Sequence, residues 1–598
     1  MRTLALLVVL TLALGAAPAQ GAKRAKTPRL KAFGSCGGLI SYARRHAPPP
    51  PPRPTLPPRR PLPTPGGGDD GSGPIAAPAP DSESGGGGSD SSTTNVQEGG
   101  VDEPDIVKSD GTNVFALTGG SLHSVDARSP LPRKLDAVAI PGYGGELLVQ
   151  GRRALAITTA DAGGTVLTEI DIANPAAMRV LRTLTVDGSY VSARQHDHTA
   201  RIVLASQPRA LDVPPPPPLS PGPVAIQDRV VATAAKRKPL RARKAGWVPS
   251  ATLRNRRTGR KRKRAIVACD DVRRTPRFTG VGMLTVLTVD FKVGLPAVDA
   301  DSVMTDADTV YASPTSLYVA TNGGWQRSDT SIHRFDLAAA DRTVYRASGQ
   351  VPGDLLNQFS LSEHKGVLRA ATTEDAGGES QSHVTALVPR SGRLEKLGQV
   401  SGLGKTERIY AVRFIEDRGY VVTFRQTDPL YTLDLADPAH PRVRGELKIL
   451  GYSSYLHPVG EHELVGIGQD ASAEGVRQGT QLSLFDVADP AAPKLLHKIA
   501  LGEASSSDAE YDHHAFLWWA PTRLAVVPIS DFSREDAGTQ AVGFTVDRVK
   551  GITEAGRSRE SGAVLRTLVV GGRLFTLTEA GLRAHDLGTL AAGPFAPF

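Results

Sequence analysis

The sequence predicts an all-β fold, a β-propeller of about eight four-stranded blades with seven to nine allowed, and three observations support it. Two stretches that start 52 residues apart, Pro429–Val443 and Gln481–Leu495, share an apolar strand, an Asp, an Asp-Pro turn and a second strand. Two further runs of alternating apolar residues precede each stretch, which makes about four strands per unit. Weaker copies recur at roughly 40 to 50 residues, the period typical of propeller blades.

A ring of such units has a clear physical basis. One four-stranded sheet cannot bury both of its faces, whereas a ring of sheets packs face to face and leaves only short edges. Each strand-end Asp can accept hydrogen bonds from backbone N–H groups of the following turn, and Pro presets φ there. We therefore interpret these Asp residues as turn residues and not as catalytic groups. The weaker copies end at Asp126, Asp171, Asp290, Asp336, Asp547 and Asp586.

Composition fits this fold and leaves the reaction class open. The 598 residues are 40% hydrophobic, and 62 Gly with 46 Pro suit a turn-rich β body with linkers. The chain contains no Gly-x-Ser-x-Gly, His-Glu-x-x-His or phosphate-binding P-loop motif. Those three enzyme classes lose support, although catalytic groups assembled from distant blades would leave no such motif.

The N-terminus predicts export. Residues 1–19 combine a basic start, an apolar run from Leu4 and the small-residue site Ala17-Pro18-Ala19, which is typical of a signal peptide. An uncleaved anchor is the alternative, weakened by the short run and the basic residues that follow. No later run approaches the ~20 apolar residues of a membrane span, so we expect no transmembrane segment after cleavage. The expected location is secreted, extracellular or associated with the cell envelope.

Export gives the two cysteines a meaning. In an oxidising compartment Cys36 and Cys269 favour a disulfide over two free thiols, and two cysteines allow only one intramolecular pairing. Closing a loop this long would stabilise the fold by roughly 5 kcal/mol in the chain-entropy account. A metal site on these cysteines has little support, because neither has a His or Cys at ligand spacing.

The chain divides into segments by composition. Residues 20–47 form an N-terminal segment with a short helix that Ser35 can cap, and this helix needs support from the rest of the protein. Residues 48–94 are rich in Pro, Gly and Ser and are predicted to be a disordered linker. The propeller is expected at 95–598, interrupted by a basic insertion at about 208–264.

Four stretches resemble a known family: Asn95–Gly111, Phe33–Cys36, Cys269–Val272 and Glu510–Phe516. They are similar to motifs of secreted prokaryotic β-propeller proteins that are distantly related to WD40 repeats. The resemblance implies a secreted propeller, and a bridge between Cys36 and Cys269 is consistent with it. The family brings no assigned reaction, so the resemblance implies a fold and a location but no activity.

The basic insertion is the strongest charge feature of the chain. Between Arg229 and Cys269 there are 15 Lys or Arg and no Asp or Glu, and removing those 15 charges from the net +9 leaves −6. Such a block predicts disorder, and it either binds an anionic polymer or is solvated without a partner. No helix-turn-helix or zinc-finger pattern supports sequence-specific nucleic acid binding. The candidate polyanion-binding residues are Lys236, Arg237, Lys238, Arg260, Lys261, Arg262, Lys263 and Arg264.

Two histidine clusters are candidate metal ligands. His196 and His198 form one cluster, and Asp512, His513 and His514 form the other. Two imidazoles with a nearby carboxylate can bind a first-row transition metal, provided that the two clusters meet in space. The alternative is that these residues are ordinary turn residues, or that they orient the groups that contact a ligand without contacting it themselves.

An acidic stretch opens the propeller. Asp102, Glu103 and Asp105 could line the mouth of the central channel, or bind Ca²⁺ through oxygen ligands. The spacing excludes the EF-hand loop, because the mid-loop Gly and the closing Glu are missing. The alternative is that these carboxylates make hydrogen bonds that close the blades.

Two functional hypotheses remain. We favour a non-enzymatic interaction or scaffold protein of the cell envelope, whose partner is an envelope protein or an anionic polymer bound by the basic insertion. The alternative is a propeller hydrolase or oxidoreductase, with or without a bound metal, that has its site at the channel mouth. The sequence requires no cofactor, while calcium or a transition metal would be compatible with the candidate residues.

Overall fold

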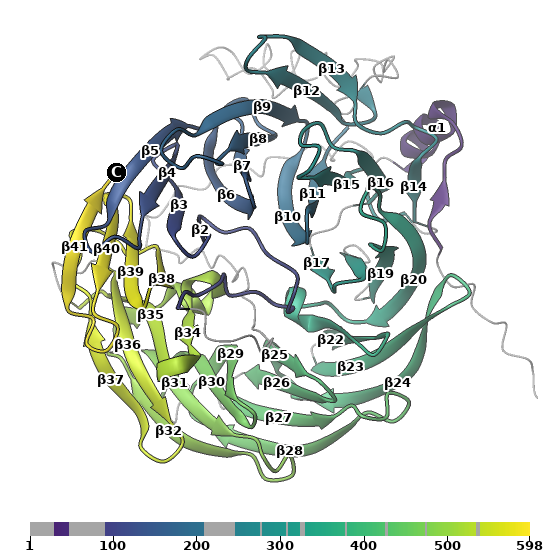
Figure 1. Cartoon of the computed structure of the whole chain (residues 1–598). Coiled ribbons are helices and arrows are strands. Elements are labelled where there is room, and N and C mark those ends of the chain that lie inside the picture. Colours follow the sequence, from purple (N-terminus) through teal and green to yellow (C-terminus); the bar gives the residue numbers. More distant parts are fainter. Residues whose placement is uncertain are drawn as a thin grey trace, which may run out of the picture.

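The computed structural model describes residues 29–46, 90–208, 246–275, 278–305, 309–322, 329–376, 379–424, 428–472, 475–533 and 539–598. Its strands form antiparallel sheets that follow one another around a ring (Figure 1). This confirms the all-β propeller prediction. Within these ranges, no helix has both the length and the apolar character needed to traverse a membrane.

We number the four-stranded antiparallel runs as units 1 to 9 in chain order. Unit 1 contains β2 (Val107–Ser109), β3 (Asn113–Thr118), β4 (Ser121–Asp126) and β5 (Arg133–Ala139). Unit 2 contains β6 (Tyr143–Gln150), β7 (Arg153–Thr159), β8 (Thr165–Asp171) and β9 (Arg179–Val186). Unit 3 contains β10 (Ser189–His196), β11 (Thr199–Ser206), β15 (Met283–Asp290) and β16 (Asp299–Met304).

Units 4 to 6 follow without interruption by other strands. Unit 4 contains β17 (Thr309–Ala312), β18 (Ser316–Asn322), β19 (Asp329–Asp336) and β20 (Val344–Pro352). Unit 5 contains β21 (Leu361–His364), β22 (Val367–Ala376), β23 (Glu379–Arg390) and β24 (Arg393–Leu403). Unit 6 contains β25 (Arg408–Ile415), β26 (Arg418–Phe424), β27 (Asp428–Asp434) and β28 (Arg442–Ile449).

The last three units complete the ring. Unit 7 contains β29 (Tyr452–Gly460), β30 (Glu463–Ala471), β31 (Arg477–Asp486) and β32 (Lys494–Ala500). Unit 8 contains β35 (Leu524–Asp531), β36 (Gln540–Asp547) and β37 (Gly551–Arg557), and two short strands, β33 (Ser505–Ser506) and β34 (Leu517–Trp519), both pair with β35. Unit 9 contains β38 (Arg566–Val570), β39 (Arg573–Thr578), β40 (Gly581–His585) and β41 (Ala592–Pro597).

The number of blades depends on how the described strands are grouped. Units 4 and 5 form one eight-stranded sheet, because β20 and β24 share a single parallel pair, Ser348 with Arg393. The described strands thus form eight hydrogen-bonded sheets that contain nine four-stranded runs. The predicted range of seven to nine includes both groupings.

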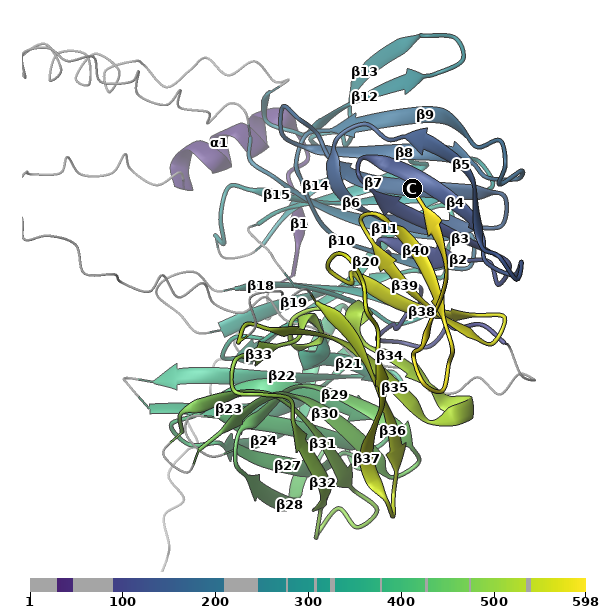
Figure 2. The same cartoon turned by 90° about the vertical axis from the view of Figure 1, so that its left-hand side faces the viewer.

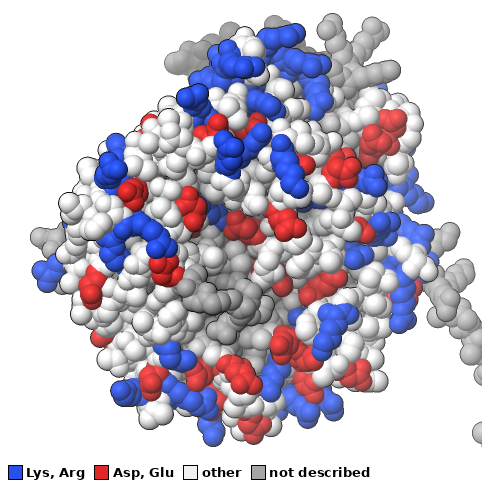
Figure 3. Space-filling view, in the orientation of Figure 1, with Lys and Arg blue, Asp and Glu red and all other residues white. Residues whose placement is uncertain are grey.

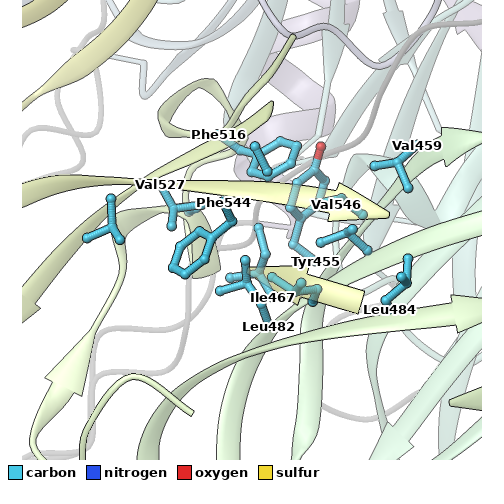
Figure 4. Close-up of a cluster of buried hydrophobic side chains, with 14 of the residues drawn as sticks. Tyr455, Val459, Ile467, Leu482, Leu484, Phe516, Val527, Phe544 and Val546 are labelled. Carbon is cyan, nitrogen blue, oxygen red and sulfur yellow. The ribbon is translucent and has the colours of Figure 1, made fainter. Parts of the chain in front are cut away.

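The hydrophobic core is divided among the interfaces between neighbouring units. Between units 7 and 8, for example, Tyr455 and Leu482 pack with Phe516 and Phe544 (Figure 4). The ring is closed by the same kind of apolar interface, in which Val114 and Val125 of unit 1 pack against Phe575 and other side chains of unit 9. Each unit therefore buries both faces, as the repeat pattern predicts.

The strand-end Asp residues are turn residues, as predicted. In each case a carboxylate oxygen accepts a hydrogen bond from the backbone N–H two residues later, at 2.8 to 3.2 Å. This is the Asx-turn geometry, which replaces a backbone turn at the strand end. The eight residues are Asp126, Asp171, Asp290, Asp336, Asp434, Asp486, Asp547 and Asp586.

The predicted N-terminal helix and disulfide are both present. Helix α1 (Cys36–His46) begins after Ser35, whose hydroxyl oxygen accepts a hydrogen bond from the backbone N–H of Gly38 at 3.1 Å. Cys36 is bonded to Cys269, and two short strands, β1 (Lys31–Ala32) and β14 (Val272–Arg274), join this region to the sheet of unit 3. The helix is thus held on the ring by a covalent bond and by strand pairing.

The predicted disordered insertion at about 208–264 is wrong in its C-terminal part. Residues 250–265 form a hairpin of β12 (Ser250–Asn255) and β13 (Lys261–Ala265), and β12 pairs with β9 of unit 2. Just before it, Trp247 is 2% exposed and packs with Leu39 and Tyr42 of α1. These apolar contacts and pairing with the open edge of unit 2 hold the hairpin in place, and neither is visible in a count of charged residues. Residues 209–245 lie outside the described ranges.

The linker boundary also needs correction. The described chain resumes at Asp90, and the Ser92 backbone N–H donates to the carbonyl of Val569 in β38 at 2.8 Å. Residues 90–94 are therefore part of the propeller and not of a disordered linker. The signal peptide prediction for residues 1–19 and most of the predicted linker fall outside the described residues.

One buried histidine in unit 4 predicts acid sensitivity. His333 of β19 is 1% exposed, and burial lowers its pKa to about 4. In the unfolded chain this histidine has a pKa of about 6.5, so between pH ~6.5 and ~4 it is protonated in the unfolded chain and neutral in the folded protein. The free energy of unfolding therefore falls by about 1.4 kcal/mol for each pH unit in that range. We expect His333→Gln to reduce this loss. Urea unfolding of both proteins at neutral and mildly acidic pH measures the difference, and equal losses would contradict the prediction.

Candidate functional site

A segment that precedes the first blade fills the middle of the ring. We call residues 90–106 the plug, and Figure 1 shows this stretch, just before β2, crossing the centre. The Asn95 amide donates to the carbonyls of His513 and Phe516 in unit 8, at 3.0 and 3.3 Å. The Gln97 amide donates to the carbonyl of Leu361 in unit 5 at 3.0 Å.

The acidic part of the plug continues these contacts on the opposite side of the ring. Asp102 exchanges two backbone hydrogen bonds with Gln195 of β10, and Asp105 does the same with Leu147 of β6. Lys108 of β2 is buried, and its ammonium group donates to the Asp102 carboxylate at 2.6 Å. The plug is therefore tied to the inner strands of units on both sides of the axis.

The predicted channel-mouth carboxylates are mostly buried. Glu103 is 3% exposed and Asp105 is 5% exposed, whereas Asp102 is half-buried. The prediction that they line an open mouth is wrong for Glu103 and Asp105, because the plug folds back on itself and places them inside the ring. A hydrogen-bonding role that closes the ring, the alternative drawn from the sequence, fits Asp105 and Asp102.

The two adjacent histidines of unit 8 meet Glu103 inside the ring. The inner strand of this unit is split into β33 and β34, and the intervening residues form two 3₁₀ turns, Asp508–Glu510 and His513–Ala515. His513 Nε2 lies 3.4 Å from Glu103 Oε2, and His514 Nε2 lies 3.7 Å from the same oxygen. All three side chains are at least 89% buried, with exposed fractions of 4% or less for Glu103 and His513 and 11% for His514.

A second carboxylate lies on the other side of the two imidazole rings. Asp512 Oδ1 is 3.1 Å from His514 Nδ1 and 3.7 Å from His513 Nδ1. Arg566 of β38 holds this arrangement, because its guanidinium donates both to Asp512 and, at 2.8 Å, to Asp105 Oδ1. Units 8 and 9 and the plug thus converge on one polar cluster, which we call the axial cluster: Glu103, Asp105, Asp512, His513, His514 and Arg566.

The electrostatics of the axial cluster separate its two histidines. Burial, assisted by the neighbouring His514, lowers the pKa of His513 to about 4, so His513 is neutral at neutral pH. Burial also acts against the charged form of His514, but Asp105 and Asp512 outweigh it and raise the pKa of His514. Burial would raise the pKa of Glu103, yet Arg194 and the two imidazoles hold it well below its usual range.

Of the two predicted histidine clusters, only the one with His513 and His514 belongs to the axial cluster. His196 and His198 lie at the turn between β10 and β11, where His196 is exposed and its Nδ1 is 3.6 Å from Asp197. Among the described residues, the group of potential metal ligands whose ligand atoms all lie within 4.8 Å of one another is Glu103, His513 and His514. The hypothesis of a site shared by both histidine clusters is therefore wrong.

Sequence reasoning missed several members of this region. Arg566 and Arg194 each carry a buried positive charge toward the plug, and Glu146 is hydrogen-bonded to Tyr190 at 2.7 Å nearby. These residues stand in ordinary strand segments of the sequence, without a local motif. Their partners lie up to 461 residues away, so no spacing along the chain could have revealed them.

A second candidate surface is the β12–β13 hairpin. All five residues of β13 are exposed, and the strand forms the outer edge of its sheet. Figure 3 shows Lys and Arg side chains gathered over this hairpin. From residue 246 to 269 the chain has no Asp or Glu, and none of the hairpin cations is in an ion pair within the described residues. The eight exposed cations are Arg254, Arg256, Arg257, Arg260, Lys261, Arg262, Lys263 and Arg264.

Of the predicted polyanion-binding residues, Lys236, Arg237 and Lys238 lie outside the described ranges. The other five lie on or next to β13. Figure 2 shows the hairpin at the same end of the molecule as α1. Trp247 before the hairpin and the Cys269 disulfide after it both attach this region to α1. The hairpin that carries the exposed cations is therefore held to the rest of the protein at both ends.

Two relatives share parts of this sequence. A relative in Methanocaldococcus jannaschii, an uncharacterized protein, is 37% identical over 239 residues, which are 40% of this chain and 36% of that protein. An uncharacterized protein of Archaeoglobus fulgidus is 47% identical over 167 residues, which are 28% of this chain and 25% of that protein. The aligned region thus spans about a third and a quarter of these two relatives.

Solved structures give weaker similarities. A chain of the mitotic checkpoint complex aligns with a TM-score of 0.30 and 11% identity, over 53% of this chain and 86% of that chain. Sqt1 of Chaetomium thermophilum aligns with a TM-score of 0.35 and 9% identity, over 53% of this chain and 80% of that chain. The sequence profile of the beta propeller domain family, in contrast, matches residues 91–590, and the chain therefore belongs to the beta propeller domain family.

Proposed function

We propose that this protein is an exported, non-enzymatic propeller of the cell envelope that binds an anionic polymer through its β12–β13 hairpin. The observation that carries the proposal is the set of eight exposed cations on that hairpin, without an acidic residue among them. A cluster of unpaired cations attracts polyanions by releasing the counterions of the polymer. The apolar N-terminus and the disulfide support export, because disulfides persist in oxidising compartments.

The position of the cations on an edge strand strengthens the proposal. Strands alternate their side chains, so Arg262 and Arg264 point to one side of β13 and Lys261 and Lys263 to the other. A polymer lying along the edge can therefore be contacted from both sides. The competing explanation is that these charges only protect an open sheet edge from aggregation. That role needs a few charges and no ligand.

A charge-removal experiment separates the two explanations. We expect the variant Arg262→Gln/Lys263→Gln/Arg264→Gln to bind long-chain polyphosphate about 100-fold more weakly at low salt, at about 1 kcal/mol for each cation near an anionic surface. The salt dependence of binding should also become shallower by about three counterions. Fluorescence anisotropy with labelled polyphosphate at several salt concentrations measures both quantities.

The matched control removes three exposed cations from another edge. Arg442, Arg444 and Lys448 of β28 are exposed, and replacing all three by Gln changes the net charge by the same amount. We expect this control to retain wild-type affinity and salt dependence within about threefold, because Arg442 and Arg444 already pair with Asp434. Equal losses in the two variants, or no binding by the wild type, would refute the proposal.

A further inference from the structure

We propose that the axial cluster is a binding site for one first-row divalent metal ion, held by Glu103, His513 and His514. This inference is independent of polymer binding. Its basis is that three potential ligand atoms, Glu103 Oε2 and the two histidine Nε2 atoms, converge inside the ring.

The distances fit ligands that share one ion. At metal–ligand bonds of about 2.1 Å, two ligands of a tetrahedral ion are about 3.4 Å apart. The two distances from Glu103 Oε2 to the histidine Nε2 atoms are 3.4 and 3.7 Å. All three ligand atoms, including the pair of histidine nitrogens, lie within 4.8 Å of one another.

The hydrogen bonds leave these nitrogen atoms available. Asp512 is a carboxylate and can only accept, so the hydrogen bond at 3.1 Å places a proton on His514 Nδ1, and the neutral ring then has its lone pair on Nε2. His513 Nε2 and His514 Nε2 are both buried and lack a hydrogen bond of good geometry, and each faces Glu103 Oε2, at 3.4 and 3.7 Å. Buried nitrogen atoms without a well-formed hydrogen bond are costly, and a cation between them and Glu103 would satisfy both nitrogen atoms.

The surroundings resemble those of protein metal centres. A carboxylate behind a ligating imidazole fixes the ring and increases its basicity, and Asp512 has this position for His514. Arg566 in turn holds Asp512 and Asp105, so the orientation is transmitted from β38. With three protein ligands, at least one coordination position is left for water or another small ligand.

The ligand set decides which class of ion fits. Two imidazole nitrogens and one carboxylate suit Zn²⁺ or a neighbouring first-row ion. Calcium binds through six to eight oxygen atoms and is a poor fit to two imidazoles. Thiolate ligands do not compete, since both cysteines of the chain are bonded to each other. The calcium option drawn from the acidic stretch therefore has no support in this cluster.

Zinc uptake by the whole chain tests the proposal. Protein purified without a polyhistidine tag is stripped with a chelator, incubated with Zn²⁺ near pH 7.5 and passed through a desalting column. We expect about one equivalent of zinc by elemental analysis and a higher melting temperature than that of the stripped protein. The variant His513→Gln/His514→Gln should lose this equivalent, and Asp512→Asn should bind about 10- to 100-fold more weakly.

The exposed histidines provide the matched control. His196→Gln/His198→Gln removes two imidazoles from a surface turn and should retain the full equivalent. If the axial variant fails to fold, X-ray absorption of the zinc-loaded wild type still decides, because imidazole ligands give a distinct scattering pattern. The proposal is overturned if the wild type takes up no zinc, as a proton shared with Glu103 would predict. It is also overturned if only the control variant loses zinc, or if the absorption spectrum contains no imidazole.

Discussion

Replacing Arg566 by methionine is expected to lower the free energy of unfolding by about 3 to 5 kcal/mol, the usual effect of removing one partner of a buried ion pair. The Arg566 side chain is 12% exposed and pairs with Asp105, which is 6% exposed. Methionine replaces the apolar stem of the arginine but leaves the Asp105 charge buried without its partner. Equilibrium unfolding in urea, followed by intrinsic fluorescence, gives the difference.

The matched control is Arg548→Met. This arginine also pairs with two carboxylates, Asp486 and Glu463, but its side chain is 44% exposed. Surface ion pairs contribute about 0 to 1 kcal/mol, so the control should lie within about 1 kcal/mol of the wild type. Similar losses in the two variants would mean that the buried position of Arg566 has no special weight.

Removal of the disulfide is the second large effect. The double variant Cys36→Ser/Cys269→Ser opens a loop with a sequence separation of 233 residues. The entropy account of loop closure predicts a loss of about 5 kcal/mol. Amide hydrogen exchange should locate the first loosening in α1, whose other contacts are the small cluster around Trp247 and the β1–β14 pair.

Reduction of the wild type provides the check on this result. A thiol reductant that breaks the bond should reproduce the stability and exchange pattern of the double variant, because both remove the covalent link and retain the fold's other contacts. A double variant as stable as the oxidised wild type would show that the unfolded chain gains little freedom. That outcome would contradict the entropic explanation.

Much of the fold could be predicted because its signals are local. Each strand-end Asp bonds to a backbone N–H only two residues later, so the sequence pattern records the turn directly. Alternation of apolar residues likewise identifies strands such as β27 and β31. The helix after Ser35 follows from a capping bond three residues long.

The remaining features depend on partners far away in the chain. The β12–β13 hairpin was missed because its stability comes from β9 and from Trp247 in the α1 cluster, which composition does not report. The burial of Glu103 was missed for a similar reason, because its neighbours His513 and Arg194 come from units 8 and 3. Asp512, His513 and His514 are neighbours in the sequence, but the sequence contains no sign that Glu103 meets them.

The plug has a consequence for the order of events during synthesis. Ser92 bonds to Val569 and Asp105 to Arg566, across 477 and 461 residues. A ribosome therefore makes the plug early and its last partners near the end, so the plug cannot complete its contacts until almost the whole polypeptide has been made. In open repeat arrays each repeat needs only its neighbours and folding can spread from any point. Here the plug contacts both early and late units, which joins early and late parts of the chain into one cooperative folding event.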